Sequence, residues 1–323
     1  MEVVSWLGYL GRFPELIVSL AYFLLLFHRM NWRDGLADEL AGPDGFRPAF
    51  YRAFWSLVKP HQVSLFDAFH AGPLDLEAVN RAPLVLIPKK MGANSADAFR
   101  PISLQNCPMK LLTNVLANRL REVIPNLVDQ DQSGFVHGHT LAEKFVYAAD
   151  LLSCCHKRRA HTVVLKLDFK KAFDSVDLLV ILSARGFDDR WCRRISSVLT
   201  SGKTAVLLTG VLGRWINCRR GLRKGDPISP FHFIIVADVL HRLIQLSCDA
   251  GDLYADDTLI LLKRNVRNIT TVKLVLDHFS VVTRLSIDFH KSTFVPLHID
   301  TPVARDMACV LGCSISSFCP PPH

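Results

Sequence analysis

Apolar and polar positions predict two central strands, each placed next to acidic residues. Residues 162–167 (TVVLKL) are apolar on both faces apart from Lys166, and Asp168 follows directly. A continuous apolar run of this length is typical of a strand in the middle of a sheet. A second run, LILL at residues 259–262, follows YADDT and is predicted to be another buried strand. The first predicted strand therefore ends at a carboxylate, and the second begins shortly after two carboxylates.

Helical spacing of apolar residues predicts the elements around these strands. Residues 43–45 (PDG) form a turn, and a helix follows in which Phe50, Phe54, Leu57 and Val58 recur at helical intervals. Three further helices are expected, at residues 63–69, 109–123 and 231–246.

Shorter signals predict the remaining strands and turns. Residues 84–87 read as a strand that ends at Pro88, and TAVLLTGVLGRWINC reads as a hairpin that turns near residues 210–213. Ser229 is a good N-cap with Pro230 at the first helical position. The mixture of helices and separate strands predicts an α+β fold.

Composition narrows the range of partners. The chain has 323 residues, half of them hydrophobic, which is enough for a core divided over two subdomains. The formal charge of +8 favours an anionic partner, either nucleic acid or an acidic membrane face. Nine cysteines without a secretory signal pattern indicate reduced thiols in an intracellular protein, in the nucleus or cytoplasm.

One apolar segment near the start competes with that interpretation. Residues 16–27 (LIVSLAYFLLLF) are twelve in number, whereas a helix needs about 20 apolar residues to cross a bilayer. The length favours a divergent leader over residues 1–41 and makes a membrane partner the minority interpretation.

The acidic residues suggest a metal site. Asp256 and Asp257 place two like charges side by side at the start of a buried strand, which calls for neutralisation. If the two predicted strands are neighbours, Asp168 joins them at one edge of the sheet. The alternative is three solvated aspartates at strand ends, where turn chemistry favours them.

A basic turn suggests contact with phosphates. Five of the eleven residues from 214 to 224 are Lys or Arg, in a glycine-containing loop that leads into a helix. Cations neutralise phosphates and glycines let the backbone approach them, although a solvated basic face would have the same composition.

The motifs together resemble one family. The blocks IPKK, FRPISLQNCPMK, QSGFVHGHT, LKLDFKKAFDSV, RRGLRKGDPISP, YADDT and LSIDFHKS occur in the order found in reverse transcriptases of LINE-type (non-LTR) retrotransposons, of the kind common in plants. YADD alone is a weak signal, but its combination with the other blocks in order is very specific. The resemblance covers most of the chain, from about residue 42 to residue 317.

The resemblance implies a right-hand polymerase fold with fingers and palm, an antiparallel palm sheet and no thumb. It assigns residues 42–161 to the fingers, 162–300 to the palm and 301–323 to a truncated tail. The implied activity is RNA-directed DNA polymerisation, with an RNA template, a DNA primer and deoxynucleoside triphosphates as partners. No stable protein partner can be inferred.

The resemblance also assigns roles to single residues. Asp168 and Asp256 would hold two Mg²⁺ ions, for which Mn²⁺ is a substitute, and Asp257 would support the site. The carbonyl of Phe169 would complete one coordination shell, and Phe173 matches the bulky gate that rejects the ribose 2′-hydroxyl. The residues expected at the nucleotide or template are Lys89, Lys90, Arg100, Lys224, Gly225 and Lys291.

Departures from the family pattern leave activity open. Lys224 stands where the family usually has glutamine, and only residues 248–253 connect the preceding helix to YADD. That connection predicts a first hairpin arm of two or three residues. The alternative function is therefore a catalytically inactive retroelement remnant that at most binds nucleic acid. A group II intron maturase or a telomerase-like enzyme also fits the palm, but each would need a thumb after residue 300.

Overall fold

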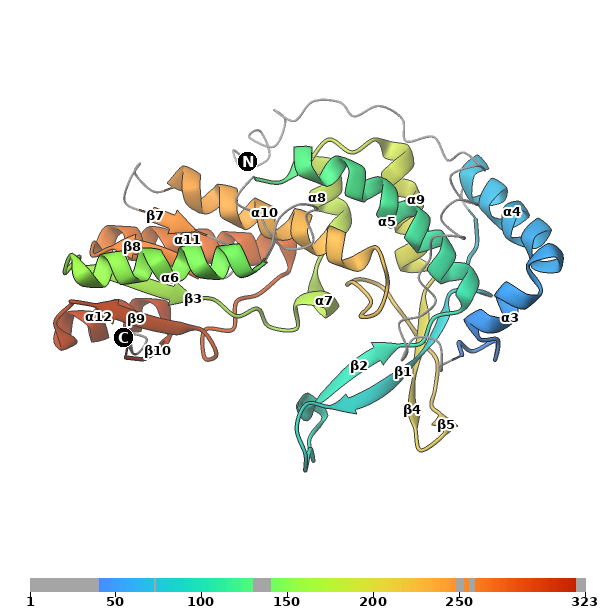
Figure 1. Ribbon diagram of the computed structural model, residues 1–323, viewed down its shortest axis with the longest axis horizontal. Helices are drawn as coiled ribbons and strands as arrows, with labels where there is room; N and C mark the ends of the chain where they lie inside the picture. Colours follow the sequence, from blue (N-terminus) through green and yellow to red (C-terminus); the bar gives the residue numbers. More distant parts are fainter. Residues whose placement is uncertain (1–40, 73, 130–140, 248–252, 256–258, 318–323) are drawn as a thin grey trace. The chain divides into compact units, whose positions relative to one another are not determined.

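The chain folds into two units that each contain one β-sheet, as the computed structural model in Figure 1 shows. The structure describes residues 41–72, 74–129, 141–247, 253–255 and 259–317. Unit 1 contains residues 1–122 and 178–232, and unit 2 contains residues 123–177 and 233–323. Each unit is described by itself. This division follows compactness, so it does not coincide with the expected fingers and palm, which were divided by motif.

Strand β3 (Thr162–Lys166) is the middle strand of the sheet in unit 2. It pairs antiparallel with β8 (Leu259–Lys263) on one side and with β9 (Thr293–Leu297) on the other. The edges are β7 (Leu253–Ala255), next to β8, and β10 (Ser314–Ile315), which lies parallel to β9. Both strands predicted from the sequence are formed, and they are neighbours in the sheet.

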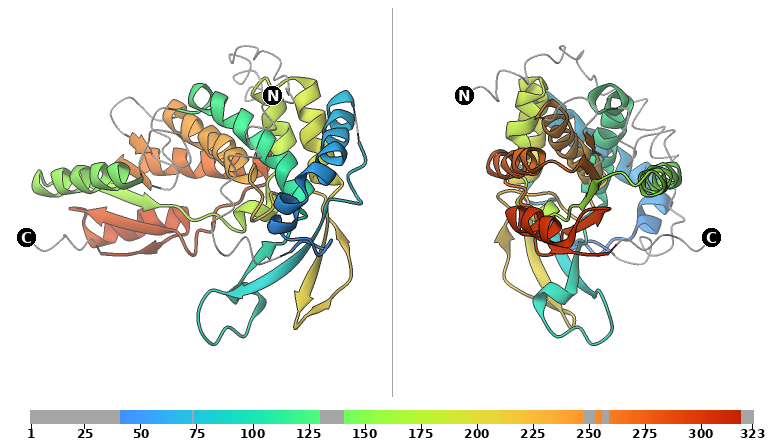
Figure 2. Two further views of the ribbon diagram at one scale, coloured as in Figure 1. Left: turned by 45° about the vertical axis from the view of Figure 1, so that its right-hand side comes forward. Right: turned by 90° about the vertical axis from the view of Figure 1, so that its left-hand side faces the viewer.

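Helices cover both faces of this sheet. On one face, Val164, Leu261 and Leu297 form a cluster with apolar side chains of α6 (Leu141–Lys157). Because side chains alternate along a strand, Val163 and Leu165 face the other way, toward α11 (Val266–Thr283). Figure 2 shows α6 and α11 on opposite sides of the sheet.

The segment expected as a tail contributes to unit 2. Helix α12 (Thr301–Leu311) buries Ala304, Met307 and Leu311 and packs against α11. It ends at Gly312, whose φ of 75° belongs to the left-handed region that glycine adopts easily. Strand β10 then extends the sheet, so residues 301–315 are part of the folded core.

The sheet of unit 1 has the order β2-β1-β4-β5, with β6 (Ile216–Asn217) also paired to β4. Strand β1 (Arg81–Pro88) pairs antiparallel with β2 (Phe99–Ser103) and parallel with β4 (Lys203–Leu208). The 3-10 helix η2 (Ala96–Ala98) precedes β2, and β5 (Val211–Leu212) returns along β4. The expected hairpin is confirmed, and Gly210 takes a φ of 83° in its turn.

The helices of unit 1 include one that differs from expectation. Helix α3 (Pro48–Ala53) stops at Phe54, and α4 (Trp55–Ala71) runs on through Pro60 instead of starting at residue 63. Proline removes a single hydrogen bond there, and the helix spans that loss because most of its length lies beyond it. Phe54 and Leu57, two of the apolar residues that recur at helical intervals, are 50% and 65% exposed.

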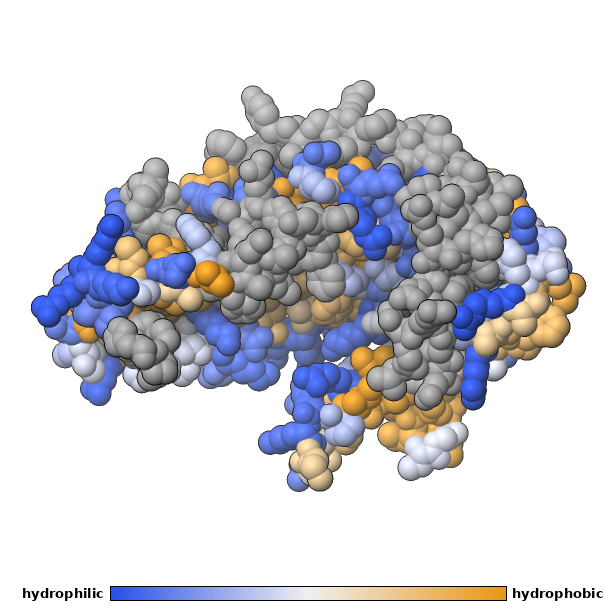
Figure 3. Space-filling view, viewed as in Figure 1, coloured by the Kyte–Doolittle hydropathy of each residue, from blue (hydrophilic) through white to orange (hydrophobic). Residues whose placement is uncertain are grey.

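Two longer helices, α5 (Cys107–Leu127) and α10 (Ser229–Ser247), have residues in both units. The remaining helices of unit 1 are α8 (Leu178–Ala184) and α9 (Asp189–Thr200), and unit 2 also contains the short α7 (Ala172–Ser175). The predicted helices at residues 109–123 and 231–246 are confirmed, each a few residues longer than expected. In unit 1, apolar side chains gather on the surface over β4 and β5 (Figure 3).

A buried carboxylate joins the end of α5 to α10 within unit 2. The fully buried Asp238 accepts hydrogen bonds from the backbone N–H of Asp129 (2.6 Å) and from Nε of Arg242 (2.7 Å). The guanidinium of Arg242 also donates to the carbonyl of Leu127 over 3.3 Å. Asp238 therefore fixes the backbone where the helix α5 ends.

We expect Asp238→Ala to lower the free energy of unfolding by about 1–3 kcal/mol, because the Asp129 N–H and the Arg242 guanidinium lose a fully buried acceptor. Asp277→Ala is the control. It also removes an ion pair between residues i and i+4, the 3.2 Å pair of Asp277 with Lys273, but the Asp277 side chain is 54% exposed. That control should cost less than about 0.5 kcal/mol. Urea unfolding of both variants measures the difference. Equal losses would contradict the structural role of Asp238.

Candidate active site

Asp168 lies just after strand β3, at one end of the strands of the sheet in unit 2. Leu167 is buried, and Asp168 is exposed just beyond the end of the strand. No hydrogen bond or ion pair from the described residues reaches the Asp168 carboxylate. Since β3 is paired on both sides, the carboxylate is exposed on a backbone that cannot shift easily.

The backbone around Asp168 is held by the segment before β9. The N–H of Asp168 donates to Oγ of Ser292 (3.0 Å), and the N–H of Asp288 donates to the carbonyl of Asp168 (2.7 Å). Oγ of Ser292 donates in turn to the carbonyl of Asp288 over 2.9 Å. Ser292 is fully buried and was not predicted as a site residue, although it follows Lys291 in the quoted FHKS block.

Phe169 continues this contact with an isolated antiparallel bridge to Ile287. The two hydrogen bonds of the bridge use the carbonyl of Asp168 and the N–H of Lys170, which donates to Ser286 over 2.8 Å. The carbonyl of Phe169 takes no part in either bond. No hydrogen bond from the described residues reaches this carbonyl oxygen, which follows Asp168 in the chain.

Asp256 and Asp257 lie outside the described residues. The strands that flank them are described: β7 ends at Ala255, which pairs with Ile260, and β8 begins with Leu259 opposite Lys166. The end of β7 and the start of β8 thus lie at the same end of the sheet as Asp168. Residues Leu253–Ala255 of β7 are described, and the full length of this hairpin arm stays a prediction. Whether Asp168 and Asp256 share a metal stays a prediction.

Lys291 is paired with a carboxylate in the same segment. Its Nζ lies 3.2 Å from Oδ2 of Asp288. Burial acts to raise the pKa of the Asp288 carboxyl, but the hydrogen bond and charge of Lys291 outweigh it, so the pKa lies below the usual value. The 69% exposure of Lys291 still leaves it accessible to a ligand.

Phe173, the predicted gate, belongs to an aromatic cluster in unit 2. Its ring stacks on Phe233 with centroids 5.3 Å apart and an angle of 15° between planes. Phe169 meets the same Phe233 ring edge-on, at 6.2 Å and 87°. All three side chains are partly buried. Phe233 was not predicted as a site residue.

The other predicted ligands belong to unit 1. Lys89, Lys90 and Arg100 are all exposed in and beside the β1–β2 hairpin, where Arg100 pairs in register with Ile87. Nζ of Lys89 donates to the carbonyl of Asp97 (2.7 Å), which holds one cation at the hairpin itself.

The RKGDP turn is tied to β2 in unit 1. The carbonyl of Lys224 accepts the N–H of Ser103 (3.1 Å), and Gly225 follows with a φ of 98°. This positive φ favours glycine, whereas a β-carbon at Gly225 would make only an ordinary contact of 3.4 Å with the Ser103 carbonyl oxygen.

The basic turn divides into two kinds of cation. Arg214, Arg219 and Arg220 are exposed, but Arg223 bonds the side chain of Asn80 and donates to the Asn80 carbonyl over 3.3 Å. The expectation that the whole turn faces phosphates is therefore corrected for Arg223, whose guanidinium serves the fold.

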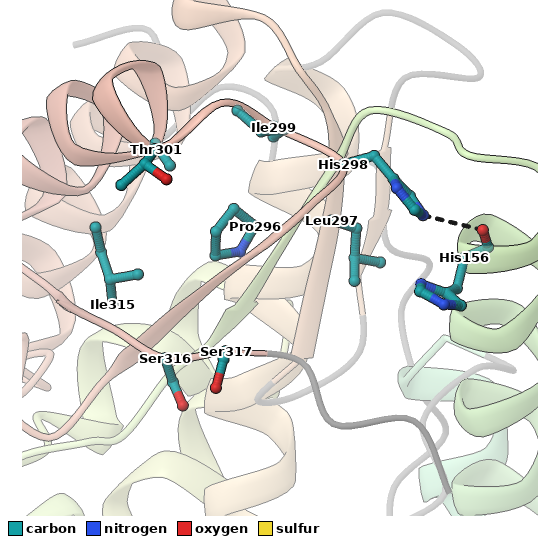
Figure 4. A pocket seen from close by; sticks show the side chains of 10 residues that line it. His156, Pro296, Leu297, His298, Ile299, Thr301, Ile315, Ser316 and Ser317 are labelled. Carbon is teal, nitrogen blue, oxygen red and sulfur yellow. Dashed lines mark hydrogen bonds between the residues drawn. The ribbon is translucent and has the colours of Figure 1, made fainter.

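A cavity of 380 Å³ lies at the other end of the sheet in unit 2 (Figure 4). The rings of His156 and His298 stack beside it with centroids 4.9 Å apart, and Nε2 of His298 donates to the carbonyl of His156 over 3.0 Å. Since Leu297 pairs with Thr162 at the start of β3, this cavity is remote from the Asp168 end of the strand.

No helix in the described part of the chain is long and apolar enough to cross a membrane. Residues 16–27, the apolar leader segment, lie outside the described residues. Among the described residues, no group of three or more His, Cys, Asp or Glu side chains is arranged to hold a metal ion.

The class of protein follows from the fold. The structure is similar to the solved apo telomerase from Candida tropicalis truncated from its C-terminal domain, with a TM-score of 0.50 and 13% sequence identity. The likeness covers 81% of this chain and 59% of that chain, and it confirms the right-hand polymerase fold.

The family follows from the sequence match. Residues 87–313 match the family model described as reverse transcriptase (RNA-dependent DNA polymerase), and the chain belongs to that family.

Relatives with curated names are retrotransposon proteins. The chain is 28% identical over 272 residues to the transposon TX1 uncharacterized 149 kDa protein of Xenopus laevis, covering 79% of this chain and 21% of the relative. It is 32% identical over 227 residues to the Pol polyprotein of the type-1 retrotransposable element R2 of Nasonia vitripennis, covering 66% of this chain and 22% of the relative. The chain thus spans about a fifth of the length of these relatives. The resemblance to LINE-type elements is confirmed, whereas a plant-like origin stays a prediction.

The Asp226 carboxyl of the RKGDP turn gives a pH test of the local structure. It is buried and accepts a hydrogen bond from Nε2 of Gln105 (3.1 Å). Burial raises the pKa of Asp226, although hydrogen bonds from Gln105 and Thr113 and the charge of Arg223 act in the other direction. The folded chain therefore holds this proton more tightly than the unfolded chain, and stability falls as pH rises from the ordinary carboxyl range through the folded pKa.

We expect Asp226→Asn to remove this decline, because the amide keeps the shape and an acceptor for Gln105 but does not ionise. The difference in the free energy of unfolding, variant minus parent, should increase as pH rises from about 4 to about 7. Urea unfolding at several pH values measures the two profiles. Parallel profiles would show that Asp226 ionises in the folded chain as it does in the unfolded chain.

Proposed function

We propose that the chain is an RNA-directed DNA polymerase domain that adds deoxynucleotides to a DNA primer on an RNA template. The observation that carries the proposal is the position of Asp168, whose carboxylate stands without a partner among the described residues at the end of the central strand. An exposed carboxylate on a strand that is paired on both sides is preorganised for a ligand. Strand pairing has already ordered its backbone, so ligand binding does not have to.

The donor set at this strand end fits magnesium. Mg²⁺ prefers hard oxygen ligands, and the Asp168 carboxylate and the unused Phe169 carbonyl are neighbours in sequence on the same edge. We propose that Asp168 and Asp256 hold two Mg²⁺ ions with support from Asp257, and that Mn²⁺ can replace them. When bound, such ions stabilise the attacking and leaving oxygens of an in-line phosphoryl displacement.

The chain's own residues would position the substrates. Ser292 and Asp288 fix the backbone on which the Asp168 carboxylate stands. Phe173 would exclude a ribose 2′-hydroxyl by collision, so that deoxynucleoside triphosphates are selected. The residues proposed to contact triphosphate or template are Lys89, Lys90, Arg100, Lys224, Gly225 and Lys291.

A catalytically inactive remnant that binds nucleic acid is the second candidate. Its basis is the short connection of residues 248–253, which predicts a first hairpin arm of two or three residues before Asp256. A short arm restrains a ligand weakly, and small misplacements of reacting groups cost orders of magnitude in rate. Phosphate neutralisation by exposed cations would survive such a fault.

We expect Asp168→Asn to lower Mg²⁺-dependent primer extension on a poly(rA)/oligo(dT) template by at least about 100-fold, since several kcal/mol of charge stabilisation depend on the metal ligands. Asp306→Asn, which neutralises an exposed carboxylate on α12, is the matched control and should leave extension unchanged. Filter binding of the same template should survive in both variants. Binding without extension by the parent chain would favour the inactive remnant.

The basic turn predicts a salt effect on binding. Arg220→Gln removes an exposed cation, so the slope of log affinity against log salt should fall by about 0.7 if it neutralises one phosphate of a single strand. Arg223→Gln is the contrast, because its guanidinium is bound to Asn80 and its loss should lower stability more than the slope. Filter binding over a salt series measures the slopes. Equal slopes for Arg220→Gln and the parent would remove Arg220 from the binding surface.

A further inference from the structure

The ring of Phe233 lies against both aromatic residues that follow Asp168. It stacks on Phe173 and meets Phe169 edge-on, so one side chain of α10 contacts the predicted gate and the residue whose carbonyl is free. Stacked and edge-on pairs at these distances are the favourable geometries for aromatic rings. Phe233 therefore does more than fill space, because both of its contacts are directional.

Phe173 comes from an element that cannot position its own side chain firmly. α7 has only four residues, and its N-cap, Lys171, takes a φ of 49° in the left-handed region and makes no side-chain capping bond. A single helical turn is marginal by itself, and a left-handed non-glycine residue adds strain.

The backbone of the α7 segment is anchored on either side of Phe173 and not at it. Before the helix, the N–H of Lys170 donates to the Ser286 carbonyl, and after it the N–H of Asp177 donates to the Thr283 carbonyl, each over 2.8 Å. Between these anchors, the stacked ring of Phe233 is the aromatic surface against which Phe173 rests.

Phe233 comes from a much more rigid element. It lies in the first turns of α10, a helix of 19 residues, and Ile234, Ile235 and Val236 next to it are each at most 2% exposed. Their burial fixes the helix, so the Phe233 ring is a fixed support for the ring of Phe173.

We infer that Phe233 is a positioning residue for sugar discrimination, which holds the Phe173 ring where a ribose 2′-hydroxyl would collide with it. This inference rests on the proposed function. Discrimination by collision concerns a single oxygen atom, so a gate that can retreat by a fraction of an ångström loses it. Phe233 itself need not touch the nucleotide.

Phe233→Leu tests the inference in primer extension. The substitution keeps an apolar side chain of similar size but removes the stacked face. We expect the ratio of kcat/KM for deoxynucleotides to that for ribonucleotides to fall by about 2- to 10-fold, the range that an aromatic pair of this kind accounts for. The change should lie in ribonucleotide use, with kcat for deoxynucleotides largely kept. Phe233→Tyr, which preserves the ring, should restore the parent ratio.

A control on the same helix separates positioning from stability. Phe231 is also buried, but it is two residues away and so faces the other side of α10, where the guanidinium of Arg121 lies 5.3 Å from its ring centroid. Phe231→Leu should lower stability and leave the discrimination ratio unchanged. An equal loss of discrimination in Phe231→Leu and Phe233→Leu would overturn the inference.

A double-mutant cycle asks whether Phe233 acts through Phe173. Phe173→Ala should lower discrimination more than Phe233→Leu does, and the double variant should be no less selective than Phe173→Ala alone. Additive losses would mean that Phe233 acts independently of the gate, and the inference would fail.

Hydrogen exchange gives a readout that does not require activity. In Phe233→Leu the amides of residues 173–176 should exchange faster than in the parent, whereas in Phe231→Leu they should not. Unchanged exchange in Phe233→Leu would overturn the inference even if the parent polymerises. If the parent chain does not extend primers, faster exchange in Phe233→Leu would still support the contact that holds Phe173, and the proposed function alone would be rejected.

Discussion

The double pairing of β3 is the constraint on which the rest of unit 2 depends. A strand with hydrogen-bonded neighbours on both sides cannot slip or bend without breaking two ladders, and its alternate side chains are buried under α6 on one face and α11 on the other. A slip of one residue would exchange those faces and move Asp168 away from the edge of the sheet. The position of the carboxylate is thus a consequence of core packing.

Charge around that strand end is arranged in two ways. Asp288 is compensated within the protein by Lys291, which lowers its pKa. Asp168, a few ångströms away along the backbone contact with Asp288, has no such partner among the described residues. The fold thus neutralises one carboxylate internally and leaves its neighbour exposed, without a partner among the described residues.

Unit 1 shows a similar contrast between charged side chains that bond within the protein and charged side chains that are exposed. Arg223 and Asp226 of the RKGDP turn serve the fold through Asn80 and Gln105, while Arg219 and Arg220 are exposed. The turn is therefore a structural element with cations added to its surface. Composition alone counts all of these residues together, which is why Arg223 was expected to face phosphates.

The sequence by itself determined the central strands, the longer helices and the family. These depend on runs and spacings that are local in the chain: continuous apolar residues make a buried strand wherever it pairs, and ordered motifs identify relatives without coordinates. Tertiary structure decided which apolar residues are covered, so that Phe54 and Leu57 proved exposed. It also decided that Ser292 holds the backbone of Asp168, more than 120 residues earlier in the chain, and that Phe233 stacks on Phe173. Such contacts join residues far apart in sequence, and the hydrogen bond or ring stack that makes each of them important exists only after the chain has folded.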